Sequence, residues 1–252
     1  MKPLHFFVLP ALLLGSGAGA ATTTVVTAPS AAQQLSQPAD AAPATFGGHG
    51  ADAPIADPWE RFNRGMYSFN GKVDRYIARP IGVAYDTVVP NVVQRRVTSF
   101  FANLREPRTM VNQLLQGEPA GAASTLGRFV VNTTAGIGGI FDPASALALT
   151  PANEDFGQTL AVWGWEDSRY FVAPLQGPST LRDFGGGFGD KPLNPMGHID
   201  DSGVSAALTV VNLGSVRSGA FALDAMRATA LDEYAMVRDM WAQRRKQQIA
   251  KR

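Results

Sequence analysis

The 252-residue sequence has 22 Lys and Arg against 21 Asp and Glu, and 45% of its residues are hydrophobic. A nucleic-acid-binding protein usually has a basic face, and this near-neutral balance gives no sign of one. The chain contains no cysteine, which excludes disulfides and a thiolate nucleophile.

The first twenty residues are typical of a secretory signal. Lys2 supplies a positive start, Phe6 to Leu14 form a short apolar segment, and Ala18-Gly19-Ala20 fits a cleavage site. An uncleaved membrane anchor is the alternative, but the apolar segment is short and contains Pro10. We therefore expect the chain to be exported and residues 1–20 to be removed.

Residues 21–56 are rich in Ala, Thr, Ser, Gln and Pro. Such a segment buries too little surface to offset its loss of conformational entropy, so we expect a disordered tether. Residues 57–245 form the expected folded domain, and residues 246–252 form a basic tail.

Five prolines indicate helix starts within about 70 residues, because proline is favoured in the first turn of a helix. They are Pro58, Pro80, Pro90, Pro107 and Pro119. These starts predict short helices joined at corners, which suit a curved or ring-like wall better than an up-and-down bundle. Asp57 is the expected N-cap of the first helix.

Large apolar residues recur at a spacing of three and four in the first expected helix, which defines one helical face. They are Trp59, Phe62, Met66, Phe69 and Val73. We interpret this face as turned towards a protein core, and contact with acyl chains is the alternative.

The second half predicts an extended run at Arg169–Val172, a helical turn capped by Ser179, and a long last helix. The apolar stripe of that last helix consists of Leu223, Met226, Ala230, Tyr234, Val237 and Trp241. Cations follow it at Arg244, Arg245, Lys246, Lys251 and Arg252. They are either solvated or attracted to anionic lipid or an acidic partner.

The stretch from Pro119 to Asn153 is apolar and carries only Arg128 and Asp142 as charges. Glycines, a proline and polar residues interrupt it, so it does not provide the roughly 20 apolar residues of a spanning helix. It is either a hairpin buried in a soluble core or the wall of a membrane-embedded channel.

Catalytic and metal-binding patterns are missing from the sequence. Only His49 and His198 remain beyond the expected signal, and neither a G-x-S-x-G nor an H-E-x-x-H motif is present. Glu154 and Asp155 lack a partner base and are expected to cap the following helix. We expect no enzyme activity, no metal and no cofactor.

Several motifs occur in order between Asp57 and Asp190. They are Asp57-Pro58-Trp59-Glu60-Arg61-Phe62-Asn63-Arg64, Met110-Val111-Asn112-Gln113-Leu114-Leu115-Gln116-Gly117, Arg128-Phe129-Val130-Val131-Asn132-Thr133-Thr134, Glu154-Asp155-Phe156-Gly157-Gln158-Thr159-Leu160 and Leu175-Gln176-Gly177-Pro178-Ser179-Thr180-Leu181-Arg182-Asp183. In these motifs the sequence resembles the MlaA (VacJ) family, which maintains phospholipid asymmetry in the Gram-negative outer membrane.

The resemblance implies an all-helical ring around an amphipathic channel on the periplasmic side of the outer membrane. It further implies partners: phospholipid, a trimeric porin and a periplasmic lipid-carrier protein, with no nucleic acid. Such a protein would remove mislocalised phospholipid from the outer leaflet and pass it to the carrier. Family members are usually acylated on a cysteine, so this chain would be held by its apolar surface.

Two groups of residues follow as candidates. The expected lipid path and gate comprises Phe129, Val130, Val131, Gly136, Ile137, Gly138, Gly139, Ile140 and Phe141. Motif residues expected to be structural are Asp57, Pro58, Asn63, Arg64, Asn70, Arg128, Asn132, Glu154, Phe156, Gly157, Gly177, Pro178, Arg182 and Asp183. The alternative function is that of a soluble periplasmic structural or lipid-binding protein without a channel.

Overall fold

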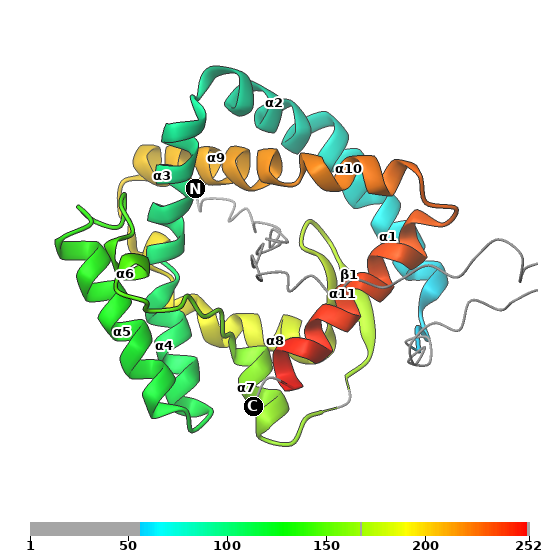
Figure 1. The fold of residues 1–252 in the computed structure, drawn as a ribbon. Coiled ribbons are helices and arrows are strands. Elements are labelled where there is room, and N and C mark those ends of the chain that lie inside the picture. Colours follow the sequence, from blue (N-terminus) through cyan, green and yellow to red (C-terminus); the bar gives the residue numbers. More distant parts are fainter. Residues whose placement is uncertain (1–55, 167, 251–252) are drawn as a thin grey trace, which may run out of the picture. The chain divides into compact units, whose positions relative to one another are not determined.

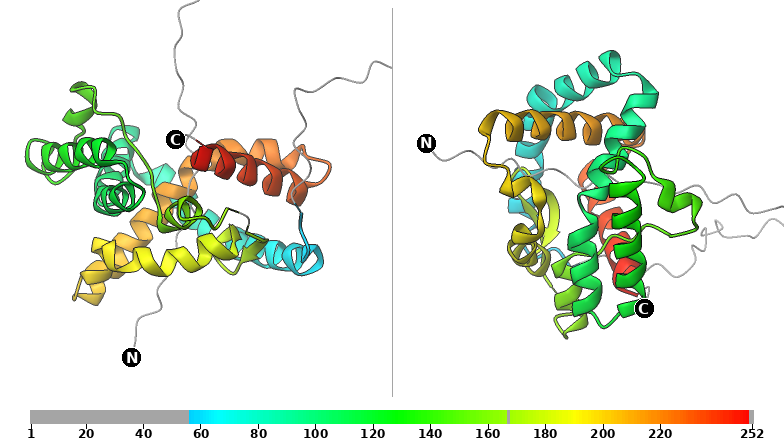
Figure 2. Two further views of the ribbon diagram at one scale, coloured as in Figure 1. Left: turned by 90° about the horizontal axis from the view of Figure 1, so that it is seen from below. Right: turned by 90° about the vertical axis from the view of Figure 1, so that its left-hand side faces the viewer.

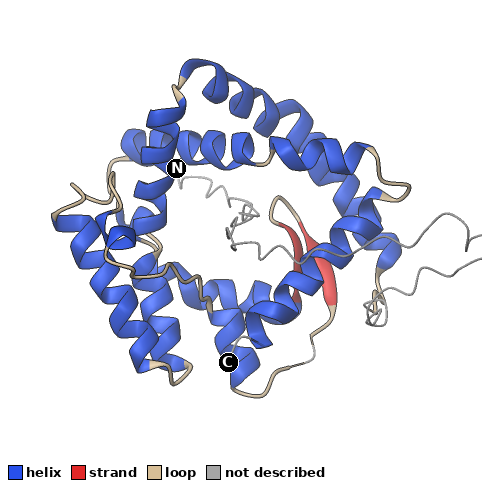
Figure 3. Ribbon diagram, viewed as in Figure 1, coloured by secondary structure: helices blue, strands red, loops and turns tan. Residues whose placement is uncertain are grey.

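The computed structural model describes residues 56–166 and 168–250, which belong to one compact unit. The expected signal, nearly all of the expected tether, and Lys251 and Arg252 of the basic tail lie outside these residues. The described part is mainly helical, with a single short pair of strands (Figure 3). The prediction of an all-α fold is therefore confirmed.

The first three elements form one continuous helical run. They are α1 (Glu60–Val73), the π-helical segment η2 (Asp74–Ala78) and α2 (Arg79–Val88). The prediction that Pro80 separates two helices is wrong. The Arg79 N–H donates to the carbonyl of Asp74, five residues back. This wider turn accommodates a proline that has no N–H to donate.

The start of α1 also differs from the prediction. Its N-cap is Trp59, whose side chain makes no capping hydrogen bond. Asp57, the predicted cap, instead accepts hydrogen bonds from the Asn63 side-chain amide at 2.7 Å and from the Tyr234 hydroxyl. Asp57 therefore joins the first helix to the last one.

The next helices follow the predicted proline starts. They are α3 (Asn91–Asn103), α4 (Glu106–Leu115), α5 (Pro119–Thr134) and the short α6 (Pro143–Ala146). Gly117 ends α4 with a φ of 79°, and the N–H of Glu118 returns to the carbonyl of Gln113 at 2.8 Å. A glycine in this left-handed conformation is a common helix stop.

The middle of the chain contains α7 (Phe156–Val162), the antiparallel strands β1 (Tyr170–Ala173) and β2 (Gly177–Thr180), α8 (Leu181–Asp190), η3 (Lys191–Leu193) and η4 (Pro195–His198). Two predicted caps are corrected. Asp155, and not Glu154, is the N-cap residue of α7 and accepts from the N–H of Gln158. Ser179 lies in β2, and its neighbour Thr180 caps α8 by accepting from the N–H of Asp183.

The predicted long last helix consists of two helices. After α9 (Ser202–Gly219), the chain forms α10 (Phe221–Ala228) and α11 (Glu233–Ala250). The interruption lies at residues 229–232, where Asp232 turns its carboxylate to Arg64 of α1 at 2.6 Å. This contact holds the start of α11 beside α1.

Contacts between the elements of the described unit close into a circuit (Figures 1 and 2). The order is α1, η2, α2, α9, α3, α5, α4, α7, α8, β1 and back to α1. The last two helices, α10 and α11, connect α9 to α7. Consecutive helices therefore lie along a curved wall, as the short proline-started helices predict.

The largest apolar cluster of buried residues is small. Tyr170, Val172 and Tyr234 form it, and Met66 and Trp241 are among the residues packed against it. Many other large hydrophobic side chains are exposed, whereas many asparagines, glutamines, threonines and arginines are buried. The fold therefore buries mainly polar contacts.

Candidate functional site

A buried ion cluster joins α4, α5 and α6. Arg128 of α5 donates to Glu106 of α4 at 3.1 Å and to both carboxylate oxygens of Asp142 at 3.2 Å. Its remaining donors reach the Ser145 hydroxyl at 3.2 Å and the Leu149 carbonyl. The Arg128 and Glu106 side chains are only 4% and 5% exposed, so the cluster is shielded from water.

Neutral polar contacts extend this cluster along the two helices. The Thr125 hydroxyl donates to Gln113 at 2.7 Å, and the Asn132 amide donates to Asp142 at 3.0 Å. The Asn132 oxygen accepts the N–H of Ala144 at 3.0 Å. Together with the ion cluster, these contacts form what we call the polar seam between α4 and α5.

Several apolar residues of the same helices lie on the surface. Leu114 is 55% exposed and Leu115 40% on α4, while Leu126 is 47% and Val130 49% exposed on α5. The hypothesis that this stretch is a hairpin buried in a soluble core is therefore wrong. In water, such side chains would be expected inside. Polar side chains facing the protein interior are typical of helices in lipid.

The loop after α5 forms the tip of this hairpin. Ile137, Gly138 and Gly139 have positive φ values of 54°, 69° and 90°. A Cβ on Gly139 would lie 2.5 Å from the Asn103 side chain of α3, whereas a Cβ on Gly138 would meet nothing within 4 Å. Gly139 thus allows a close approach to α3, and Gly138 lies in open space.

The predicted path and gate residues lie on one hairpin but not on one face. Ile137 is 65% exposed, and Ile140 and Phe141 are about 40% exposed. Phe129 and Val131 are half-buried, and Gly136 and Gly139 are buried. The Phe141 ring also lies under the Arg96 guanidinium of α3, 4.5 Å from its centroid. The tip is therefore attached to α3 on one side and apolar on the other.

The aromatic face of α1 resembles the hairpin in its exposure. Phe62 is 54% exposed, Phe69 46% and Trp59 36%. The prediction that this face turns to a core holds for Met66, which packs against the buried apolar cluster, and is wrong for the exposed Phe62 and Phe69. The buried residue of α1 is Asn63, which accepts the N–H of Val172 at 2.8 Å. The exposed aromatic rings instead fit the alternative considered from the sequence, in which this face contacts acyl chains.

A second ion cluster fixes the end of α11. Arg245 contacts Asp155 at 2.6 Å and Asp183 at 2.9 Å. Burial opposes ionisation of the Asp155 carboxyl, but Arg245 outweighs it and holds the pKa of Asp155 well below its ordinary value. Arg245 is therefore paired inside the protein. The interpretation of Arg245 as one of the solvated cations at the C-terminal end is wrong.

Other motif residues also make contacts between elements. The Asn70 side chain bridges the carbonyl of Ala173 and the N–H of Leu175, which holds the turn between the strands. Gly177, the first residue of β2 after that turn, has a φ of 83°. Pro178 lies opposite Val172 in the strand pair.

Three further motif residues meet where α7 and α8 pack together. A Cβ on Gly157 would lie 2.5 Å from the Asp183 carboxylate, so only glycine fits there. The Phe156 N–H donates to Asp190 at 3.1 Å. Arg182, nearly fully buried, donates to the backbone carbonyls of Trp165 and Glu166 at 3.0 Å.

The sequence analysis did not predict two further clusters of polar contacts. Arg217 of α9 contacts Asp74 at 2.6 Å and Asp224 at 2.9 Å. Asn112 donates to Asp190 at 2.9 Å and accepts the Thr159 hydroxyl at 2.7 Å. A signal for the second existed: Thr109, Asn112, Gln113 and Gln116 recur with helical spacing, opposite Leu114 and Leu115.

The described residues contain no group of three or more His, Asp or Glu placed to hold a metal ion. Within the same residues, no single helix is both long and apolar enough to cross a membrane. By length and composition alone, α9 and α10 pass that test as a pair with a 47° bend.

The fold and the polar seam define a helical protein in which polar contacts are buried and many hydrophobic residues lie on the outer surface. The chain belongs to the family described as MlaA lipoprotein, whose model matches residues 55–248. The resemblance found in the sequence motifs is thereby confirmed.

Relatives and a solved structure match most of the chain. The intermembrane phospholipid transport system lipoprotein MlaA of Escherichia coli K12 is 35% identical over 194 residues, covering 75% of this chain and 76% of that protein. An uncharacterized protein of Rickettsia bellii is 32% identical and covers 77% of each chain. A structure solved to explain maintenance of bacterial outer membrane lipid asymmetry matches with a TM-score of 0.66 and 35% identity, covering 75% of this chain and 96% of that one.

Proposed function

We propose that this chain is a phospholipid transport component of the outer membrane, which it enters from the periplasmic side. It removes mislocalised phospholipid from the outer leaflet and passes it to a periplasmic carrier protein, in association with a trimeric porin. The transfer needs no bond to be made or broken, and the chain acts without catalysis. The resemblance of the motifs and the name of the Escherichia coli relative support this assignment.

The observation that carries the proposal is the hairpin of α4 and α5, which is polar on the inside and apolar on the outside. Its polar seam is buried, and leucines and valines of both helices are exposed. Lipid surrounding the hairpin removes the cost of exposing these residues to water, and the seam pairs Arg128 with Glu106 and Asp142 inside the protein. The exposed aromatic rings of α1 are likewise more stable in lipid than in water.

The alternative is a soluble periplasmic protein that binds lipid without embedding in a membrane. It requires apolar side chains to be inside, and the described helices place them outside. The same exposure explains how the chain stays in a membrane: burial of apolar surface contributes about 25 cal/mol per Å².

Fractionation and a lipid assay test the proposal together. The chain should remain with outer membranes in high salt, which weakens charge contacts, and should leave them in detergent. In a strain lacking its gene, outer-leaflet phospholipid should rise, and expression of the chain should lower it again. Recovery of the unmodified protein in the salt wash would show that it is not embedded.

A charge on the apolar surface provides the matched variant. Val130→Asp places a carboxylate on the exposed face of α5 and should release part of the protein into the salt wash. Gln247→Asp, at an exposed position of α11, is the control and should stay in the membrane fraction. Equal retention of both variants would contradict embedding through the hairpin.

A further inference from the structure

The continuous helical run of α1, η2 and α2 packs against the rest of the described unit along one side (Figure 1). Asn63 and Asn70 hydrogen-bond to the backbone of β1 at 2.8 and 2.9 Å, and Asp74 binds an arginine of α9 at 2.6 Å. Further along, Gly82 and Tyr85 are buried against side chains and backbone of α9. These residues follow one another at helical spacing, so the other side of the run faces away from β1 and α9.

Large apolar side chains are exposed on that other side at every seventh residue. They are Phe62 (54% exposed), Phe69 (46%), Tyr76 (74%) and Val83 (49%). Seven residues correspond to about two helical turns, so the four side chains follow the run over about 30 Å. None of them belongs to the hairpin of α4 and α5, and they therefore form a second exposed apolar surface.

Four cations flank these apolar side chains. Arg61 and Arg75 each directly precede one of them in the sequence, and Lys72 and Arg79 each follow one by three residues. All four cations are exposed, and none has a hydrogen-bond or ion-pair partner among residues 56–166 and 168–250. Their charges are therefore not neutralised within the described unit.

The carboxylates of the same run are engaged in other contacts. Glu60 pairs with the arginine one turn further along at 2.7 Å, and Asp74 pairs with α9. Asp86 accepts a hydrogen bond from a glutamine amide of α3 at 3.2 Å. The exposed side of the run therefore combines uncompensated positive charge with large apolar side chains, and its complement is a surface that is both anionic and apolar.

A bilayer leaflet that contains anionic phospholipid has both properties, because a layer of phosphates lies directly above the acyl chains. Aromatic rings are favoured at that boundary, and Lys and Arg lay their apolar stems along it while their charges reach the headgroups. An acidic protein surface also attracts cations, but the regular apolar row calls for an apolar phase over the same 30 Å or so.

We propose that the run of α1, η2 and α2 lies along the headgroup boundary of a lipid leaflet and binds anionic phospholipid. Its cations contact the phosphates, and its apolar side chains lie among the acyl chains. This inference rests on the proposed location of the chain in a membrane, and it adds the charge class of the lipid and the residues that select it. Each such cation strengthens binding about fivefold, which corresponds to about 1 kcal/mol.

Vesicle flotation tests the charge preference. The purified full chain is diluted from detergent into vesicles of phosphatidylcholine alone or with one third of phosphatidylglycerol, and the bound fraction is measured against lipid concentration. Binding to the vesicles with phosphatidylglycerol should be at least tenfold tighter, and high salt should remove this difference. Equal binding to both vesicles at low salt would overturn the proposal and assign the cations to another acidic partner.

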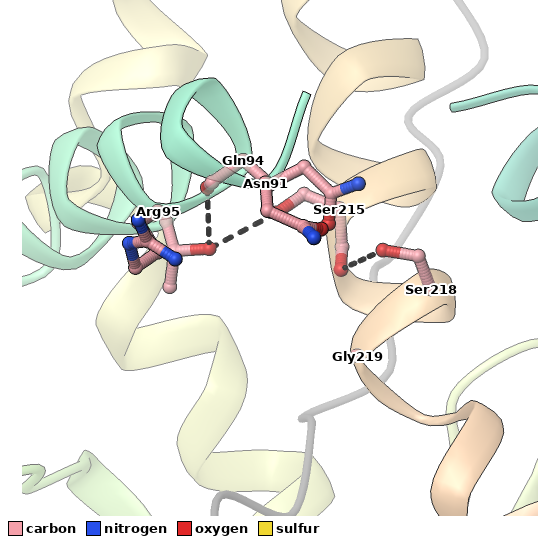
Figure 4. A pocket seen from close by; sticks show the side chains of 7 residues that line it. Asn91, Gln94, Arg95, Ser215, Ser218 and Gly219 are labelled. Carbon is pink, nitrogen blue, oxygen red and sulfur yellow. Dashed lines mark hydrogen bonds between the residues drawn. The ribbon is translucent and has the colours of Figure 1, made fainter. Parts of the chain in front are cut away.

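A matched pair of double variants identifies the residues. Arg75→Gln with Arg79→Gln should weaken binding to vesicles with phosphatidylglycerol about 25-fold and leave binding to phosphatidylcholine unchanged. Arg95→Gln with Arg105→Gln removes the same net charge from exposed positions outside the run. Arg95 lies on α3, beside serines of α9 (Figure 4). This control should lose much less affinity, and equal losses in both double variants would overturn the proposal.

Tyr76→Gln tests the apolar half of the surface. The Tyr76 side chain is 74% exposed and has little packing to lose, so thermal stability should not change. Its replacement should weaken binding to both kinds of vesicle by a similar factor, because the loss is apolar and not electrostatic. Unchanged binding to both would show that this side of the run lies outside the lipid and would overturn the proposal.

Neutral vesicles separate this inference from the proposed function. If the wild-type chain fails to bind phosphatidylcholine and is released from outer membranes by salt, embedding through the hairpin of α4 and α5 fails. If it binds phosphatidylcholine and shows no preference for phosphatidylglycerol, the proposed function stands and only this inference is wrong.

Discussion

Buried arginines hold the described elements together at the level of single residues. Arg128 joins α4 to the segment around α6, Arg217 joins η2 to α9 and α10, and Arg245 joins α11 to α7 and α8. Each of these guanidinium groups contacts two carboxylates. Removing the arginine of such a cluster leaves two partly or fully buried carboxylates without their counter-ion, so single substitutions have large effects.

The Arg128 cluster gives the first prediction. Arg128→Met should lower the free energy of unfolding by about 3–5 kcal/mol, because Glu106 is then left buried and unpaired. Combining it with Glu106→Gln should recover part of that loss, because the remaining amide is neutral. Denaturant unfolding of the purified proteins in detergent measures both. A double variant as unstable as the sum of its single variants would contradict the coupling.

The Arg245 cluster predicts a pH dependence. Burial works against the Asp155 carboxylate, yet Arg245 lowers the pKa of Asp155 below its ordinary value. A lowered pKa in the folded state contributes stability above the unfolded pKa of about 4 and loses it as pH falls further. The unfolding temperature should therefore drop as the pH falls below about 4.

Asp155→Asn isolates this contribution. The variant should unfold at a lower temperature than wild type at pH 7, and the difference between the two should shrink as the pH falls below about 4. The comparison cancels groups that titrate in the opposite direction, such as Glu106 and Asp190, whose pKa values are raised by burial. A difference that is constant from pH 7 to pH 3 would show that the ion pair does not contribute.

At the level of elements, the hairpin of α4 and α5 is the distinctive unit. Its polar stripe includes Thr109, Asn112 and Gln113, and its exposed leucines lie on other faces of the helices. Sequence periodicity locates both stripes but leaves open which one faces inwards. Which stripe faces inwards depends on whether water or lipid surrounds the hairpin. The buried ion cluster at Arg128 shows that the polar stripe faces inwards.

The hairpin tip gives a prediction based on two neighbouring glycines. Gly139→Ala should detach the tip from α3, because its methyl group would overlap the Asn103 side chain. Gly138→Ala adds only the strain of a positive φ, about 1 kcal/mol, because its surroundings are open. If the tip acts as a gate, Gly139→Ala should change the rate of phospholipid removal more than Gly138→Ala does.

Hydrogen exchange of the hairpin tip tests the same pair of variants physically. The amides of residues 136–141 should exchange faster in Gly139→Ala than in Gly138→Ala. Equal exchange in the two variants would show that contact with Asn103 does not position the tip.

For the described unit as a whole, the sequence predicts most helices and the curved path they follow. The proline starts at Pro90, Pro107 and Pro119 are correct because each follows a genuine corner. Pro80 misleads because a π-helical turn accommodates it, and Ser179 misleads because a short strand pairs with Tyr170–Ala173. Long-range pairing of this kind has no local signature.

Of the candidate site residues, the sequence locates the hairpin but not its partners. Arg128 stands out as one of two charges in an apolar stretch, and its contact with Glu106 requires the packing of two helices. The contact between α3 and α9 cannot be predicted, because Thr98 and Ser215, whose hydroxyls lie 3.4 Å apart, come together only after the circuit closes. The pattern of residue types along the chain indicates which helical faces are polar and which are apolar. Which residues come together to form a site depends on tertiary contacts.

The central claim is that the outer face of α5 lies in lipid. The chain has no cysteine, so a single spin label can be attached at Leu126→Cys, and Asp200→Cys serves as an exposed control. The measurement is the label's collision rate with apolar oxygen and with a water-soluble nickel chelate in native outer membranes. We predict that the label at position 126 collides mainly with oxygen and the label at position 200 mainly with the chelate. Strong chelate contact at position 126 would contradict the account.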